Sequence, residues 1–242
     1  MYFVGIDLAW GERSPTGVAV ADARGRLVHL AAARDDTDIV AQLAPYTAEE
    51  SLLAIDAPLV VTNPTGNRPC EAALNRDFRA FEAGCHPSNT GHPWFAAGSR
   101  AARVAEALGR PAIEVYPHAA TVALFGLPRT LKYKQKPGRD VAQLRAELLR
   151  LMSLVESLTD ASPPLDVARN PRWAALREAV EAATRKSELR RAEDPVDAVV
   201  CAYVALFATR RPGDVTTYGD DATGCIVTPA LSRTAPPGEW GR

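Results

Sequence analysis

The feature that most constrains this chain is a charged residue inside an apolar strand at its start. The first ten residues, MYFVGIDLAW, predict a buried β-strand that is interrupted by Asp7. An unpaired carboxylate in such a strand costs several kcal/mol. Asp7 therefore requires a cation, a shell of hydrogen bonds or an open cleft. A hydrogen-bonded carboxylate of the core is the alternative interpretation of the same pattern.

The same combination of an apolar element and an acid occurs twice more. The apolar run LLAI (52 to 55) ends on Asp56, and the helix-like segment EDPVDAVVCAYVALF (193 to 207) begins with Asp194 and Asp197. A turn residue before a proline is the alternative interpretation of Asp56. Three acidic positions, each joined to a buried element, are the main candidates for a functional site.

The segment that contains Asp194, Pro195 and Asp197 also fits the start of a helix. In that interpretation the three residues are the N-cap, the first helical residue and the third. Capping accounts for Asp194 completely. It accounts less well for Asp197, because the acid at the third position is usually the longer Glu or Gln. The helix dipole would keep both acids ionised, which suits a metal ligand as well as a cap.

The length and charge balance predict one domain. The chain has 242 residues, 28 of them basic and 29 acidic, so any surface for nucleic acid must be local. We expect a single domain over residues 1–230, with insertions at 60–110 and 125–190. The Pro- and Gly-rich residues 231–242 are expected to form a flexible tail.

Cysteine usage and hydropathy favour a cytoplasmic protein. The four cysteines show no CxxC spacing, which indicates reduced, mostly structural thiols. No basic-then-apolar leader opens the chain, and no run of about 18 apolar residues occurs. We therefore expect no membrane span. The sequence does not indicate an oligomeric state.

The order of elements predicts an α/β fold with one mixed sheet and flanking helices. Strands over 1–10 and 16–33 are joined by short turns, so the first three strands should be antiparallel. The helix over 35–46 is a crossover, which places the strand at 52–56 parallel to the sheet. A strand is expected over 111–119, and a last pair of strands near the C-terminal end. Helices are expected over 70–84, 100–109, 141–158, 170–185 and 193–210.

Neither a GxGxxG nor a GxxxxGK[ST] sequence is present, so dinucleotide-binding and P-loop folds lose their main support.

The acids suggest a divalent cation. If the strands that carry Asp7 and Asp56 are adjacent, their backbones lie about 4.8 Å apart. Two carboxylates at that distance repel each other, which raises one pKa unless a cation neutralises them. Mg²⁺ or Mn²⁺ fits because hard cations prefer oxygen ligands. Glu114, within the apolar AIEVY, could complete the metal shell from a neighbouring strand, and a solvated acid on an edge strand is the alternative.

A basic segment is the candidate for binding phosphate. The segment LKYKQKPGR contains Lys132, Lys134, Lys136 and Arg139. These cations suit phosphate contacts, and Tyr133 between them could supply one stacking ring. His118, which follows a predicted strand end, is expected as a polar residue of the cleft. An ordinary solvated loop explains the basic segment equally well.

Seven motifs in order carry a resemblance to a known family. GIDLAWG, AIDAPL, CEAALNRDF, GCHPSN, EVYPHA, LKYKQKPGR and DPVDAVVCAYVALF resemble the motif series of domain of unknown function 429, a family regarded as predicted nucleases of RNase H-like fold. The resemblance implies a five-stranded sheet whose first three strands are antiparallel and whose fourth lies parallel beside the first.

The resemblance also implies the site. In the RNase H-like superfamily, acids on the first strand, the fourth strand and the last helix bind two divalent metals. The matching positions are Asp7, Asp56 and Asp197, with Asp194 as a partner one turn earlier. DPVDA is similar to the last acidic motif of Holliday-junction resolvases. The end of the fourth strand has no obvious Glu, and Asp56 takes that place.

Three functions follow as hypotheses. The first is a metal-dependent nuclease that hydrolyses phosphodiester bonds with two ions about 4 Å apart, while the basic segment holds the backbone phosphates of the nucleic acid. The second is a non-catalytic module of the same fold that binds nucleic acid or metal. The third is a phosphotransferase of the actin and sugar-kinase superfamily, although that architecture normally needs two such domains.

Overall fold

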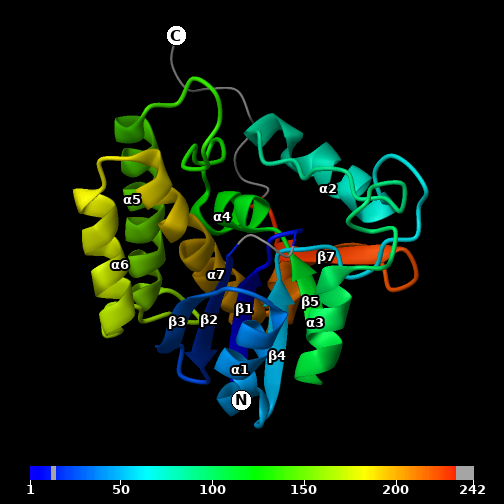
Figure 1. The fold of residues 1–242 in the computed structure, drawn as a ribbon, viewed down its shortest axis with the longest axis horizontal. Helices are drawn as coiled ribbons and strands as arrows, with labels where there is room; N and C mark the ends of the chain where they lie inside the picture. Colours follow the sequence, from blue (N-terminus) through cyan, green and yellow to red (C-terminus); the bar gives the residue numbers. More distant parts are fainter. Residues whose placement is uncertain (12–14, 233–242) are drawn as a thin grey trace.

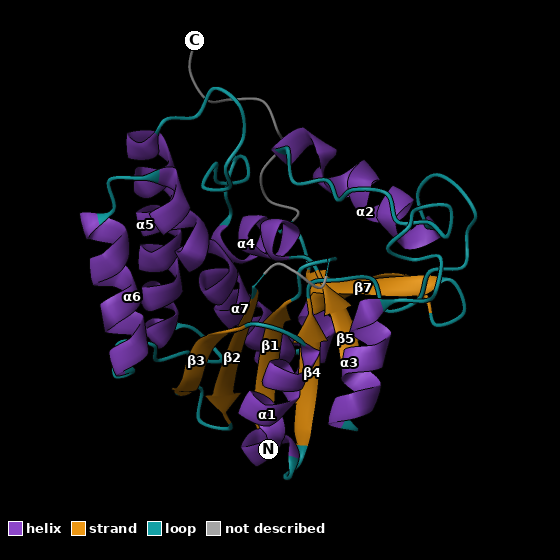
Figure 2. Cartoon of the chain, viewed as in Figure 1, coloured by secondary structure: helices purple, strands orange, loops and turns teal. Residues whose placement is uncertain are grey.

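A computed structural model describes residues 1–11 and 15–232, and it shows a seven-stranded sheet with helices on both faces (Figures 1 and 2). The strands are β1 (Tyr2–Asp7), β2 (Thr16–Asp22), β3 (Leu27–Ala33), β4 (Ser51–Ile55), β5 (Ala112–Val115), β6 (Val215–Asp220) and β7 (Gly224–Pro229). Their order across the sheet is β3-β2-β1-β4-β5-β7-β6.

The first four strands pair as the sequence predicts. Strand β2 is antiparallel to β1 and to β3, whereas β4 is parallel to β1. Strand β5 continues the parallel part beside β4. The predicted number of five strands is wrong, because the C-terminal hairpin extends the sheet. Strand β7 pairs in parallel with β5, with Val227 opposite Val115, and β6 pairs antiparallel with β7 at the edge.

Two sets of helices cover the sheet. The helices are α1 (Asp36–Thr47), α2 (Pro69–Phe78), α3 (Arg100–Leu108), α4 (Pro117–Phe125), α5 (Val141–Ser157), α6 (Pro171–Ala182) and α7 (Lys186–Arg210). Short 3-10 turns follow α2 and α5 and precede β6, at Arg79–Phe81, Leu158–Asp160 and Pro212–Asp214. Helices α1 and α3 pack on one face, and α7 lies across β1 and β2 on the other, backed by α5 and α6 (Figure 1).

Alternation along β1 and β4 decides which side chains face α7. Successive side chains of a strand point to opposite faces. In β1, Val4 and Ile6 join the core under α1 and α3, whereas Phe3 joins the core on the α7 side. Asp7 has the same parity as Phe3, and Asp56 the same parity as Ala54, which also lies in the core on the α7 side. Both acids therefore belong to the face that α7 covers.

Two glycines allow α7 to lie directly on the sheet. A Cβ atom at Gly5 would lie 1.9 Å from the carbonyl oxygen of Ala198. A Cβ atom at Gly17 would lie 2.0 Å from the carbonyl oxygen of Asp194. Because glycine has no Cβ, the backbone of α7 can approach β1 and β2 closely. This approach brings the acids of α7 near the end of β1.

The start of the last helix differs from the prediction. Helix α7 begins at Lys186 rather than at residue 193, so Pro195 lies inside it. Its N-terminus is held by Glu188, whose Oε2 accepts hydrogen bonds from the N–H groups of Thr184 and Arg185. The predicted N-cap role of Asp194 is therefore wrong, because the helix already has a cap two turns earlier. The capping explanation for Asp194 and Asp197 no longer applies.

Helix α4 was not predicted from the sequence, and glycines follow the ends of α3 and α4. Pro117, predicted to stop a strand, is the first residue of α4, a position that proline favours. Gly126 follows the last residue of α4 as its C-cap, with a φ of 58°. The predicted C-cap at Gly109 is confirmed, with a φ of 64°.

Parts of the domain prediction lie beyond the structural description. Of the predicted flexible tail at 231–242, residues 233–242 lie outside the described residues. The predicted limits of the domain and of its two insertions stay predictions. In the described ranges, no helix has the length and apolar character that crossing a membrane requires.

Candidate functional site

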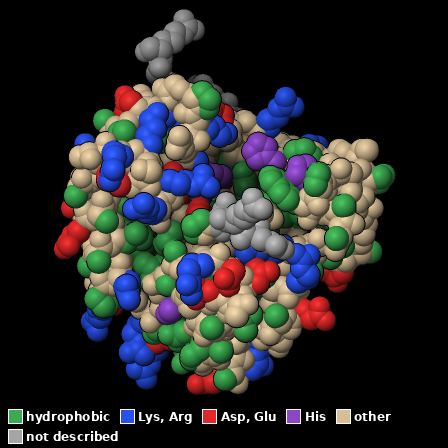
Figure 3. Space-filling view, viewed as in Figure 1, with side chains coloured by type: hydrophobic (Ala, Val, Ile, Leu, Met, Phe, Trp, Pro, Cys, Tyr) green, Lys and Arg blue, Asp and Glu red, His purple; other side chains and the backbone are tan. Residues whose placement is uncertain are grey.

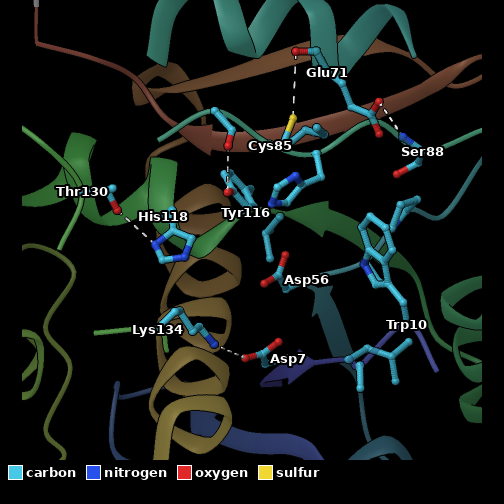
Figure 4. Close-up of a pocket in the computed structure, with 18 of the residues that line it drawn as sticks. Asp7, Trp10, Asp56, Glu71, Cys85, Ser88, Tyr116, His118, Thr130 and Lys134 are labelled. Atoms are coloured by element: carbon cyan, nitrogen blue, oxygen red, sulfur yellow. Dashed lines mark hydrogen bonds and ion pairs between the residues drawn. The ribbon is translucent and has the colours of Figure 1, made fainter. Parts of the chain in front are cut away.

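The carboxyl ends of β1, β4 and β5 open into a cavity of about 490 Å³. Asp7 is the last residue of β1, and Asp56 directly follows β4. The N–H of Asp56 donates a 2.8 Å hydrogen bond to the carbonyl oxygen of Ile6, so the parallel pairing extends to these two acids. Figure 4 shows both carboxylates directed into the cavity. The sequence prediction that the two strands are adjacent is thereby confirmed.

Helix α7 contributes two further acids. Asp194 lines the cavity, and Asp197 lies one turn later with only 1% of its surface exposed. We call the four residues Asp7, Asp56, Asp194 and Asp197 the acidic cluster. Residues far apart in the sequence meet here because α7 rests on β1 and β2.

A lysine occupies the middle of the acidic cluster. Lys134 Nζ lies 2.5 Å from Asp197 Oδ2, 3.4 Å from Asp7 Oδ2 and 3.5 Å from Asp194 Oδ1. The ion pair with Asp7 is visible in Figure 4. Lys134 was predicted as a phosphate contact. In this structure its ammonium group is instead the counter-ion of three aspartates.

Burial and mutual repulsion shift the pKa values of the acids. Loss of hydration raises the pKa of Asp7 to about 8, against the attraction of Lys134 and with further repulsion from Asp197. Burial and repulsion from Asp7 hold the pKa of Asp56 well above its usual range, and burial raises that of Asp194. Although burial opposes its charge, the ion pairs with the aspartates hold the pKa of Lys134 well above its usual range. The cluster therefore binds positive charge strongly.

Two buried rings support the cluster from the α4 side. The hydroxyl of Tyr133 donates a 2.7 Å hydrogen bond to Asp197 Oδ1, and its ring packs 5.4 Å from the ring of His118. Tyr133 is 1% exposed, so it cannot supply the stacking ring predicted for it. Burial lowers the pKa of His118 to about 4. His118 is therefore neutral near pH 7, and its Nδ1 lies 3.0 Å from the hydroxyl of Thr130.

Basic side chains also line the cavity. The lining includes Lys132, Lys136, Arg139 and Arg190, which we call the basic rim. Lys132 forms an ion pair with Glu82, and Arg139 Nη1 donates to the carbonyl oxygen of Lys134. On the face seen in Figure 3, histidine side chains (purple) edge a hollow, with Lys and Arg side chains (blue) beside it. All four predicted phosphate contacts thus line the cavity, although Lys134 is engaged by the acidic cluster. Arg190 is an addition that the sequence prediction missed.

Glu114 belongs to a separate buried network. Arg68 Nη1 and Nη2 donate to the two oxygens of Glu114 at 2.9 and 2.5 Å, and Arg68 Nε donates to Glu71 at 2.8 Å. The N–H of Leu59 also donates to Glu114. Both oxygens of Glu114 are thus engaged, although the residue lines the cavity. This geometry favours a structural role over the predicted metal-binding role.

A fifth acid of the region was not predicted. Glu193 is fully buried, and neither of its carboxylate oxygens has a hydrogen-bond partner among residues 1–11 and 15–232. Burial raises the pKa of its carboxyl to about 7. Its position four residues before Asp197 places it on the same side of α7, and that spacing is the signal in the sequence that could have identified it.

The donor chemistry of the acidic cluster fits a divalent cation, although the cluster is filled by an ammonium group. Carboxylate oxygens are the ligands that Mg²⁺ and Mn²⁺ prefer. Within residues 1–11 and 15–232, no three His, Cys, Asp or Glu side chains are arranged to hold a metal ion. Lys134 supplies the positive charge at this place. A divalent ion would therefore have to displace Lys134.

The fold and the cleft define a mixed α/β protein whose cavity combines an acidic cluster with a basic rim. The chain belongs to the family described as "Protein of unknown function (DUF429)", whose profile matches residues 5–223. This match confirms the family that the seven motifs indicate. No curated protein and no solved structure matches the chain.

Proposed function

We propose that this protein is a metal-dependent nuclease of RNase H-like fold. The observation that carries the proposal is the convergence of aspartates from two strands and one helix at one site, with three of the four on a single cation. Lys134 contacts Asp7, Asp194 and Asp197, and Asp56 lies beside Asp7 at the next strand end. Acids that are brought together at the cost of burial indicate a function rather than a contribution to stability.

The sheet supports the RNase H-like part of the proposal. The first three strands are antiparallel, and β4 lies parallel beside β1. The family resemblance implies this pairing of the first four strands. The acids lie on the first strand, after the fourth strand and on the last helix, and this distribution supports a role as metal ligands.

The residues of the cleft have separate roles in this proposal. The acidic cluster would hold Mg²⁺ or Mn²⁺, which would supply an activated water and neutralise charge at the phosphate. Tyr133 fixes one oxygen of Asp197 through its hydrogen bond, which leaves the other oxygen directed at the cation. The basic rim neutralises the phosphates of the bound strand. His118 remains uncharged and positions Thr130 at the wall.

The test is a nuclease assay with Mg²⁺ or Mn²⁺ on single-stranded, duplex and branched nucleic acid. We expect wild-type cleavage that depends on the metal and falls at least about 100-fold in Asp7→Asn, because a group that holds the metal is lost. Asp160→Asn is the matched control, since Asp160 is exposed and does not line the cavity. Cleavage that is unchanged in Asp7→Asn would end the proposal.

A second candidate function is a binding module without hydrolysis. Lys134 favours it, because a cluster that is already neutralised by an ammonium group needs no metal to be stable. Calorimetric titration with nucleic acid separates the two functions. Nucleic acid bound without turnover at any metal concentration supports the binding module, and metal-dependent turnover supports the nuclease.

A further inference from the structure

A cluster of four aromatic rings stands at one end of the cavity. The ring of Trp10 lies 5.5 Å from that of Trp94 and 5.3 Å from that of Phe95, and the ring of His92 lies 4.4 Å from that of Trp94. We call these four residues the aromatic platform. Trp10 lines the cavity and lies three residues after Asp7. Figure 4 shows its side chain among the residues that line the cavity, to the right of Asp56 and Asp7.

Trp94 leaves the platform open to solvent. Half of its surface is exposed. Among the described residues, the exposed large apolar side chains are those of Met1, Val28 and Trp94. Trp94 is the aromatic member of this group, and it is in contact with a residue of the cavity wall. An exposed indole that continues a binding cleft is a surface available to a flat ligand.

The platform is held rigidly. Arg100 is 4% exposed, and its Nη1 donates to the carbonyl oxygens of Ala9 at 2.5 Å and of Gly11 at 3.1 Å, on either side of Trp10. Arg100 is itself paired with Asp36 of α1 at 2.7 Å. The other rings are carried by a turn in which the N–H of Phe95 donates to the carbonyl oxygen of His92. A rigid platform loses little entropy when it binds a ligand.

We propose that the aromatic platform stacks an unpaired nucleobase of the bound strand, so that the substrate is single-stranded or locally unpaired nucleic acid. This inference rests on the proposed nuclease function, in which the basic rim binds the backbone phosphates of the strand. The bases of a duplex are already stacked on one another, whereas an unpaired base offers a free face to an aromatic ring. Because every base has such a face, the platform adds affinity with little sequence preference.

Charge complementarity identifies the occupant. A nucleic acid strand carries an anionic backbone beside flat apolar bases. The cavity offers cations along the basic rim, and the aromatic platform adjoins the cavity through Trp10. An apolar peptide would match the rings and leave the charged groups of the rim and of the acidic cluster desolvated without partners, at a cost in free energy.

The test compares wild type with Trp94→Ala, with EDTA present so that no metal-dependent hydrolysis interferes. Two labelled probes of equal length are used, a single-stranded oligothymidylate and an abasic strand with the same phosphates. We expect Trp94→Ala to bind oligothymidylate about 5- to 100-fold more weakly than wild type does, and the abasic strand equally well. Trp94→Phe should retain most of the affinity. Val28→Ala, an exposed apolar residue on β3, is the control.

Several outcomes would overturn the inference. Equal affinity of wild type for the two strands would do so, as would an unchanged affinity of Trp94→Ala for oligothymidylate or no binding by wild type. The nuclease proposal fails separately. If wild type binds oligothymidylate through Trp94 and cleaves no substrate with Mg²⁺ or Mn²⁺, the result supports base stacking on the platform and contradicts the nuclease function.

Discussion

Lys134 Nζ lies 2.5 Å from Oδ2 of Asp197, a carboxylate that is 1% exposed and whose other oxygen accepts a hydrogen bond from the hydroxyl of Tyr133. The acidic cluster thus carries its counter-ion on the loop between α4 and α5. Arg139 holds the same loop by donating a 2.7 Å hydrogen bond to the carbonyl oxygen of Lys134. An internal ammonium group supplies positive charge to three of the four acids, and a divalent cation has to compete with it.

Asp7→Asn should be more stable than wild type, and the difference in the free energy of unfolding should grow as the pH rises. Burial raises the pKa of Asp7 to about 8 from an ordinary value of 3.8, so between these values the unfolded chain releases a proton that the folded chain keeps. Wild-type stability therefore falls with rising pH relative to Asp7→Asn. We expect the variant to gain about 1–3 kcal/mol at pH 8 and almost nothing at pH 4. Denaturant unfolding at a series of pH values checks this, and a gain that is largest at pH 4 would contradict it.

The hydrogen bond from Tyr133 to Asp197 should contribute more to stability than a neutral bond does. Tyr133→Phe should cost about 1.5–3 kcal/mol, because a charged acceptor loses a buried donor. Tyr203→Phe is the comparison, since the hydroxyl of Tyr203 donates at 2.9 Å to the neutral carbonyl of Pro163. That change should cost about 0.5–1.5 kcal/mol. Urea unfolding of both variants decides the order, and an equal or smaller cost for Tyr133→Phe would show that the acceptor charge is unimportant.

The Arg68 network should prove structural. Arg68→Met leaves Glu71 and Glu114 buried without their cation and should cost about 3–5 kcal/mol. Arg34→Met, which breaks an exposed pair with Asp38, should cost far less, because solvent screens an exposed ion pair. Urea unfolding compares the two variants, and a cost below that of Arg34→Met would contradict the structural role.

Glu114→Gln separates the structural role from the metal-binding role predicted from the sequence. It should lower stability and leave the Mn²⁺ affinity unchanged, because Arg68 and Leu59 engage both of its oxygens. Calorimetric titration with Mn²⁺ provides the measurement. A weaker affinity in Glu114→Gln would restore the interpretation of Glu114 as a ligand.

The close approach of α7 to the sheet should depend on Gly5. A methyl group at this position would lie 1.9 Å from the carbonyl oxygen of Ala198, so Gly5→Ala has to push the helix away. We expect a loss of about 1–3 kcal/mol. Gly213→Ala, where no atom of the described part of the chain lies within 4 Å of the added Cβ, should have little effect. Thermal unfolding of the two variants compares them, and equal stability would show that the helix does not rest on β1 at this point.

The sequence was sufficient to locate Asp7, Asp56, Asp194 and Asp197, because acids on apolar elements are costly and therefore conspicuous. The pairing of β1 to β4 also followed from the lengths of the connections. Position along the chain does not reveal which side chains from distant segments will form ion pairs. Lys134 looked like a member of a solvated basic loop, and only the folded chain shows it inside the acidic cluster.

Other failures have local causes. Pro195 resembles the start of a helix, yet α7 begins at Lys186 because Glu188 caps it there. The C-terminal hairpin was recognised as two strands, but nothing in its sequence shows that β7 would extend the sheet beside β5. The partner of Glu114 was missed because Arg68 lies 46 residues away in a turn-rich segment.

The most direct test of the acidic cluster as a divalent-cation site is a calorimetric Mn²⁺ titration of wild type, Lys134→Met, Lys132→Met and Asp7→Asn. Lys134→Met removes the competing ammonium group and should bind Mn²⁺ roughly tenfold or more tightly than wild type does. Lys132→Met should match wild type, because Lys132 pairs with Glu82 outside the cluster, and Asp7→Asn should bind more weakly. Mn²⁺ affinity that is unchanged or reduced in Lys134→Met would contradict a cation site at this cluster.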